Sequence, residues 1–227
     1  MAGTRIDFDG LIDRHLMREQ RPKAVGRYYP SEIGKCIRNV WYSYNHPTEI
    51  KPELRRVFEM GNILHDFIIE VLRDTRNGDI QLLDAEMPFK LEFGEPDSKF
   101  VVSGRIDDLL LLKAGDKKVL VEVKSTKTLK YMRGPMEHHK TQLQFYMYAT
   151  GVHDGVMLYI DKSTLETKSF EVAFSMDQAK RIINKFRALH KHLTAATLPA
   201  PEAKKLPDEK WMCRYCEYAD KCAKDEK

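Results

Sequence analysis

The chain has 227 residues, 42% of them hydrophobic and 10% aromatic, which is enough to bury one sizeable core but short for two. Its 38 Lys and Arg residues nearly balance 34 Asp and Glu residues, so the net charge of +4 permits a nucleic-acid partner without requiring one. No apolar run approaches the roughly 20 residues that span a bilayer, and residues 1–10 lack a signal peptide's apolar stretch. We therefore expect a cytoplasmic protein with no membrane partner.

The N-terminal third of the chain is predicted to be mainly helical. Residues 1–27 are charged and weakly patterned, and we expect an extension there ahead of a single domain over residues 28–227. The stretch from Tyr28 to Ser31 predicts a short capped helix leading to Cys36. Apolar residues recur at helical spacing between Pro52 and Arg76, which predicts a helix with one apolar face. That face carries Leu54, Val57, Phe58, Gly61, Leu64, His65, Ile68, Val71 and Leu72.

The middle of the chain predicts three strands over residues 80–93, 100–112 and 117–124. Turn signals at 94–97 and 114–116 separate them, which indicates an antiparallel meander. Further elements follow in chain order: a helix over 138–150, strands over 156–160 and 168–174, and a capped amphipathic helix over 175–196. The mixture of elements predicts an α/β fold, and a connector over 199–210 precedes a terminal group of cysteines.

A charged pair interrupts the apolar strand that runs from Val119 to Ser125. Glu122 and Lys124 point to the same face of that strand, because side chains alternate along it. Taken alone, these residues are better explained by a solvated ion pair. However, a hairpin partner would bring Asp107 close to Glu122, and a hard divalent cation relieves the repulsion of two such carboxylates. Asp108 points to the opposite face, and we assign it to a turn or the surface.

Two helices carry further polar candidates. His65 lies on the apolar face of the first long helix, where a lone histidine is more often a core residue than a metal ligand. His139, Gln142 and Tyr146 share one face of the helix that follows the charged strand. On their own, the last three fit an ordinary amphipathic helix.

The four cysteines favour a metal site over disulfides. Cys213, Cys216 and Cys222 lie together near the end of the sequence, and Cys36 lies far upstream. Their spacing alone fits zinc as well as an iron–sulfur cluster, since tetrahedral thiolate sites serve both metals.

The spaced motifs, taken in order, resemble those of RecB-like nucleases in the PD-(D/E)xK superfamily. The pairs are Gly61 and His65, Gly104 and Asp107, Glu122 and Lys124, and Gln142 and Tyr146. One cysteine before these motifs and three after them resemble the split set of the iron–sulfur nucleases. In size and layout the chain is similar to stand-alone CRISPR-associated exonucleases of the Cas-four type.

The resemblance implies a restriction-endonuclease-like core, a central mixed sheet flanked by helices. It implies that His65, Asp107, Glu122 and the Val123 carbonyl bind Mg²⁺ or Mn²⁺, and that Lys124 acts on the attacking water. Gln142 and Tyr146 would complete the catalytic set by positioning the strand. Cys36 and residues 211–222 would form an iron–sulfur module with Cys213, Cys216 and Cys222 as ligands, 4Fe–4S being favoured.

The implied activity is a DNA exonuclease acting on single strands or single-stranded ends. Within its family such an enzyme processes spacer precursors beside the CRISPR integrase. A stand-alone repair or viral end-resection nuclease and a non-catalytic DNA-binding assembly module are the alternatives. Basic residues after the charged strand predict a path for the phosphate backbone, although such runs are usually solvated faces. They are Lys127, Lys130, Arg133 and, further along, His139.

Overall fold

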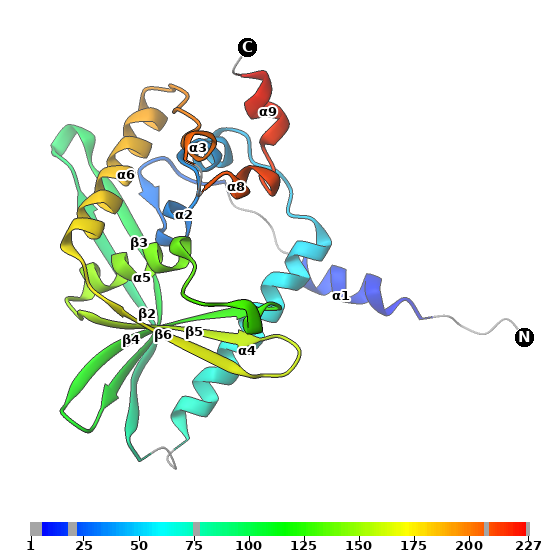
Figure 1. Ribbon diagram of the computed structural model, residues 1–227. Helices are drawn as coiled ribbons and strands as arrows, with labels where there is room; N and C mark the ends of the chain where they lie inside the picture. Colours follow the sequence, from blue (N-terminus) through cyan, green and yellow to red (C-terminus); the bar gives the residue numbers. More distant parts are fainter. Residues whose placement is uncertain (1–5, 18–21, 75–77, 207–208, 226–227) are drawn as a thin grey trace, which may run out of the picture.

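The computed structural model describes residues 6–17, 22–74, 78–206 and 209–225. Within them, six strands form one mixed sheet with helices on both faces (Figure 1). The α/β prediction is therefore confirmed. The strands are β1 (Arg27–Tyr28), β2 (Ile80–Phe93), β3 (Phe100–Leu112), β4 (Lys117–Thr126), β5 (Asp154–Asp161) and β6 (Thr167–Ala173).

The sheet combines an antiparallel meander with one parallel crossover. β2, β3 and β4 pair antiparallel in chain order, as their turn signals predict. β5 then joins β4 in parallel, after a connection that contains a helix, and β6 closes this edge antiparallel to β5. The short β1 pairs in parallel with the start of β3. β4 consequently lies in the interior of the sheet, between β3 and β5.

Helices account for most of the remaining described residues. They are α1 (Phe8–Leu16), α2 (Pro30–Ile33), α3 (Ile37–Asn45), α4 (Pro52–Arg73), α5 (Glu137–Thr150), α6 (Met176–Thr194), α7 (Glu202–Lys205), α8 (Trp211–Arg214) and α9 (Ala219–Lys224), with 3-10 turns η1 (Pro96–Ser98) and η2 (Leu129–Tyr131). Local signals set several ends. The Ser175 side chain caps the start of α6 by accepting from the Gln178 N–H, and Gly151 ends α5 with a φ of 71°.

Two clusters of buried side chains cover the two faces of the sheet. On one face, Leu64 and Ile68 of α4 pack with Val121 and Val123 of β4. On the other, α3, α5 and α6 pack over Leu120 and its neighbours in the larger core. The alternation along β4 thus assigns its odd-numbered side chains to the α4 face and its even-numbered ones to the α5 face.

The predicted apolar face of the first long helix is only partly buried. α4 packs on the sheet from Leu64 onward, whereas Leu54, Val57, Phe58 and Val71 remain exposed. The predicted helix with one apolar face is present, but periodicity does not say what covers that face, and the sheet covers only part of it. Residues 75 and 76 of the predicted helix lie outside the described residues.

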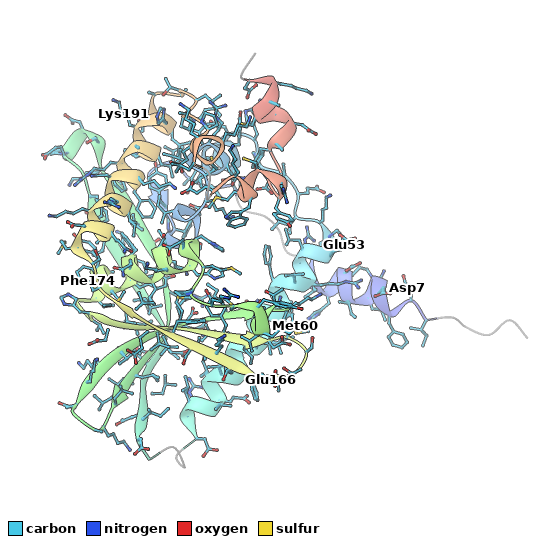
Figure 2. The ribbon with its side chains drawn as sticks, viewed as in Figure 1. Asp7, Glu53, Met60, Glu166, Phe174 and Lys191 are labelled. Atoms are coloured by element: carbon cyan, nitrogen blue, oxygen red, sulfur yellow. The ribbon has the colours of Figure 1, made fainter. Side chains whose placement is uncertain are left out.

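A helix that sequence patterning did not predict lies before this exposed part of α4. Asp7 caps α1 by accepting from the Gly10 N–H, and Arg56 of α4 forms ion pairs with Asp9 and Asp13. Figure 2 shows α1 and the first turns of α4, marked by Asp7 and Glu53, extending away from the sheet. None of the described helices is long and apolar enough to cross a membrane.

The close approach of α2 and α5 gives a test of the packing. A Cβ atom added to Gly34 would lie 2.7 Å from the His138 carbonyl oxygen, so the two helices would have to separate. We expect Gly34→Ala to lower the free energy of unfolding by about 1–3 kcal/mol, measured by denaturant titration. Gly134→Ala is the matched control, because nothing lies within 4 Å of its added Cβ. Equal stability of the two variants would contradict this packing.

Candidate active site

The candidate catalytic residues gather where β3 and β4 separate. Backbone pairing between these strands ends at Asp108 opposite Val121. One residue further, Oδ2 of Asp107 accepts a hydrogen bond from the Val123 N–H at 2.9 Å. A side chain thus replaces the next backbone bond, and the register places Asp107 opposite Glu122. The register at the end of the β3–β4 pairing therefore brings these two carboxylates close together, as predicted.

Glu122 and Lys124 lie on the α5 face of β4. The Glu122 side chain is completely buried, whereas a quarter of the Lys124 side chain is exposed. Lys124 Nζ forms an ion pair with Glu122 Oε1 at 2.5 Å, and apart from this ammonium neither carboxylate oxygen has a partner. The lysine is an electrostatic partner that leaves both oxygens available to another ligand.

The local electrostatics favour an additional positive charge. Burial raises the pKa of the Glu122 carboxyl well above its usual value, the negative charge of Asp107 adds to this, and Lys124 opposes it. For Lys124, burial lowers the pKa, but the charges of Glu122 and Asp107 outweigh burial and the net pKa is raised. Two carboxylates therefore share one ammonium group in a buried site.

α5 covers this charged cluster with an amide and a phenol. Gln142 donates from Nε2 to the Tyr146 hydroxyl at 2.8 Å, and both side chains are buried. Burial raises the pKa of Tyr146, and the negative charge of Glu122 is the next largest cause. The two residues one helical turn apart thus face Glu122.

His65 and Asp108 meet on the opposite face of the sheet. His65 Nε2 lies 3.8 Å from Asp108 Oδ2, and Asp108 is completely buried. Burial raises the pKa of the Asp108 carboxyl, His65 lowers it and Asp107 raises it. Our assignment of Asp108 to a turn or the surface is therefore wrong. Asp107 and Asp108 do point to opposite faces of β3, as alternation predicts. The second face is buried because a histidine from α4 packs against it.

Unpartnered buried atoms make this region suitable for a cation. Buried side-chain atoms without a hydrogen-bond partner in the described residues include His65 Nε2 and both carboxylate oxygens of Asp108 and Glu122. Leaving such atoms unsatisfied is unfavourable unless another ligand reaches them. Carboxylate oxygens suit Mg²⁺ or Mn²⁺. Among the described residues, no three His, Cys, Asp or Glu side chains form a group that could hold a metal ion by themselves.

The four cysteines converge from the two ends of the fold. Burial raises the pKa of the Cys213 thiol, and Cys36, Cys216 and Cys222 all contribute electrostatically, which brings the four thiols into one neighbourhood. Two residues of α3 supply donors to this group. Asn39 Nδ2 lies 3.3 Å from Cys216 Sγ, and the Arg38 guanidinium lies 3.6 Å from Cys222 Sγ. Positive and N–H groups aimed at sulfur are suited to thiolate ligands.

The predicted basic path begins directly after β4. Lys127, Lys130 and Arg133 are all exposed, and Lys130 Nζ lies 4.9 Å from the ring centre of Tyr131. His139 differs from these cations. Its pKa falls to about 3 because of burial, the neighbouring His138 and Lys124, so it is neutral at physiological pH. A contact of His139 with DNA would therefore not depend on charge.

The fold and the site together indicate the class of protein to which the chain belongs. The model of the PD-(D/E)XK nuclease superfamily matches residues 15–223, and the chain belongs to this family. Divalent metal ions are the cofactors of such nucleases.

Among curated proteins, the chain is similar to CRISPR-associated exonuclease Cas4 from Saccharolobus solfataricus. The two are 22% identical over 215 residues, which cover 93% of each. The solved structure of SSO0001 has a TM-score of 0.61 at 21% identity, covering 92% of this chain and 89% of that one. The alkaline exonuclease LHK-Exo from Laribacter hongkongensis has a TM-score of 0.51 at 15% identity, covering 76% and 90%. These structural likenesses support the fold.

Exchanging Glu122 for glutamine tests whether this carboxylate binds a cation. In cation-free buffer, Glu122→Gln should raise the unfolding temperature by about 2–4 °C, because a buried charge is removed. Added Mn²⁺ should raise the unfolding temperature of the wild type but not that of the variant. Glu95→Gln, at an exposed turn, is the control and should behave like the wild type. An undiminished response of Glu122→Gln to Mn²⁺ would exclude Glu122 as a ligand.

Proposed function

We propose that the protein is a divalent-cation-dependent DNA exonuclease that acts on single strands or single-stranded ends. The observation that carries this is the set of buried, unpartnered carboxylate oxygens beside Lys124 at the fork of β3 and β4. Such a cluster of buried carboxylates is unfavourable when no ligand is bound, and it is suited to holding a cation next to a phosphodiester. Membership of the nuclease superfamily and similarity to an exonuclease support the same reading.

We assign the cation to Asp107, Glu122 and the Val123 carbonyl, with His65 as the further ligand that the family resemblance implies. In this structure His65 lies against Asp108 on the other face of the sheet. When bound, Mg²⁺ or Mn²⁺ would lower the pKa of a water, clamp the scissile phosphate and neutralise developing charge. The hydrogen bond from the Val123 N–H fixes Asp107 against β4, so that its second oxygen remains available. Asp108 is adjacent to His65 and would orient its imidazole.

Lys124 has the clearest catalytic role among the side chains. It is the part of the charged cluster that reaches solvent, while its ammonium stays next to Glu122. There it would hold the attacking water beside the phosphate and stabilise negative charge as the bond breaks. Gln142 fixes the Tyr146 hydroxyl, and this pair limits how the DNA strand and the Glu122 carboxylate are placed.

We assign an iron–sulfur cluster, with 4Fe–4S favoured, to Cys36, Cys213, Cys216 and Cys222. The convergence of the thiols and the donors from α3 support a thiolate site. Zinc is the alternative on ligand chemistry alone. The cluster would join two segments separated by most of the chain, so its role here is to close the fold.

The setting of the activity follows from similarity alone. Because the chain is similar to a CRISPR-associated exonuclease over 93% of its length, we favour processing of spacer precursors alongside the CRISPR integrase. A role in DNA repair or viral end resection would use the same site chemistry. A non-catalytic DNA-binding module would have no use for buried carboxylates that lack partners.

Two substitutions test the catalytic assignment. Glu122→Ala and Lys124→Ala should each slow the Mn²⁺- or Mg²⁺-dependent degradation of end-labelled single-stranded DNA by about 10²–10³-fold. One loses a cation ligand, and the other loses the group that acts on water and phosphate. Lys118→Ala, exposed at the far end of β4, should retain wild-type activity. Full activity in Glu122→Ala would place the nuclease site elsewhere or reveal a contaminant.

A cysteine substitution tests the cluster and its structural role together. Anaerobically purified wild type should be brown and contain iron and acid-labile sulfide. Cys216→Ser should lose both and unfold at a lower denaturant concentration, because the two ends of the fold are no longer joined. Tyr215→Phe, an exposed neighbour, is the control. A colourless wild type with stoichiometric zinc would replace the cluster assignment with a zinc site.

A further inference from the structure

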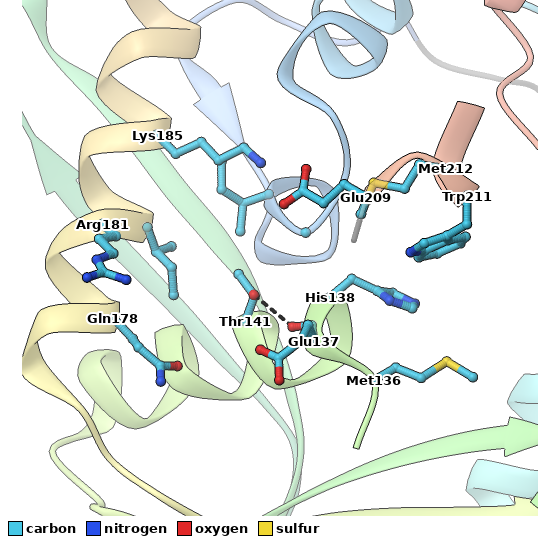
Figure 3. A pocket seen from close by; sticks show the side chains of 13 residues that line it. Met136, Glu137, His138, Thr141, Gln178, Arg181, Lys185, Glu209, Trp211 and Met212 are labelled. Atoms are coloured by element: carbon cyan, nitrogen blue, oxygen red, sulfur yellow. Dashed lines mark hydrogen bonds between the residues drawn. The ribbon is translucent and has the colours of Figure 1, made fainter. Parts of the chain in front are cut away.

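A cavity of about 770 Å³ lies beside the first turn of α5, apart from the charged cluster. Figure 3 shows α6 supplying Arg181 and Lys185 to one wall and α8 supplying Trp211 to the other, with Met136 and His138 between them. The cavity is therefore lined by basic, aromatic and apolar groups, together with the carboxylates of Glu137 and Glu209. Its volume is in the range of small-molecule sites.

Trp211 presents an aromatic surface to this cavity. Its side chain is 46% exposed, whereas the chain's other tryptophan, Trp41, is 9% exposed and part of the core. The ring centres of Trp211 and His138 are 5.5 Å apart, so the histidine supports one part of the indole. A half-exposed indole with a supported position is a stacking surface for a planar group.

Two cationic side chains of α6, Arg181 and Lys185, lie one helical turn apart at the cavity wall. Lys185 is engaged, since its ammonium lies 2.6 Å from Glu202 and donates to the Lys35 carbonyl. No described carboxylate forms an ion pair with Arg181, which is exposed at the cavity wall. Arg181 is therefore the group available to an incoming phosphate. The carboxylate of Glu209 also lines the cavity and disfavours phosphate on its own side.

Short contacts connect this cavity to the catalytic strand. Lys124 of β4 pairs in register with Tyr159 of β5. The Tyr159 hydroxyl lies 3.0 Å from His139 Nδ1 and accepts from the Met136 N–H, also at 3.0 Å. Met136 and the adjacent His138 line the cavity. One layer of side chains therefore separates the cavity from Lys124.

We propose that this cavity is a binding subsite for an unpaired nucleotide of the DNA strand whose scissile phosphate lies at Lys124. The base stacks on Trp211, and a phosphate of the same strand contacts Arg181. A base in a duplex is held by its partner and stacked on its neighbours, so it cannot enter the cavity. The subsite therefore selects single strands. This inference rests on the proposed nuclease function and adds the element that would determine its preference for unpaired DNA.

The test measures binding and cleavage with one set of variants. A single-stranded oligonucleotide in cation-free buffer should quench the tryptophan fluorescence of the wild type, because Trp211 is the exposed indole. Trp211→Ala should weaken oligonucleotide binding by about tenfold and raise KM with little change in kcat, whereas Trp211→Phe should retain most of the binding. Arg181→Glu should weaken binding similarly. Arg187→Glu, exposed elsewhere on α6, is the charge-matched control.

The outcomes distinguish this inference from the proposed function. If the wild type cleaves DNA but Trp211→Ala and Arg181→Glu bind the oligonucleotide within twofold of it, the subsite is refuted and the nuclease stands. If the wild type neither binds nor cleaves DNA, both fail. A mononucleotide that quenches with the same affinity as the oligonucleotide would make the cavity a nucleotide site and overturn its assignment to the strand.

Discussion

The burial of a carboxylate in the middle of a β-sheet is the constraint on which the rest of this site depends. Glu122 lies on an interior strand, completely buried and without a hydrogen bond to either oxygen. A lone ionised group in such a place is unfavourable by several kcal/mol. The surrounding elements each reduce this penalty: Lys124 adds a positive charge, and the fork of β3 and β4 leaves room for another ligand between Asp107 and Glu122. The cation that we propose for catalysis would reduce the same burial penalty.

Local patterns predicted the elements that depend on local interactions. The β2–β3–β4 meander follows from turn residues and strand alternation, and the same alternation placed Glu122 and Lys124 on one face. The gathering of Cys36 with three distant cysteines could not come from spacing, since nothing local links them. It required the resemblance to a family. In the structure Cys36, Cys216 and Cys222 each act electrostatically on Cys213, but the described cysteines do not form a group that could hold a metal ion.

Tertiary context decided the features that patterns missed. Alternation with Asp107 assigns Asp108 to a turn or the surface, yet Asp108 is buried and His65 of α4 meets it there. The apolar residues at the start of α4 suggest a buried face, but the sheet ends before it reaches them. Trp211 would pass for packing around the cysteines until its neighbour across the cavity, Arg181, is known. In each case the partner lies far away in the sequence, where periodicity carries no information.

The meeting of Cys36 with the last cysteines also sets an order of events during synthesis. Cys36 precedes Cys213 by 177 residues, since 213 minus 36 is 177. At about 5–20 residues per second, Cys36 leaves the ribosome roughly 9 to 35 s before that partner exists. Through this interval its thiol and the packing surface of α3 lack the α8–α9 segment that completes them. Assembly of the metal site that we assign to these thiols must therefore wait until Cys222 has been made, and until then the Cys36 thiol is open to oxidants and competing metals.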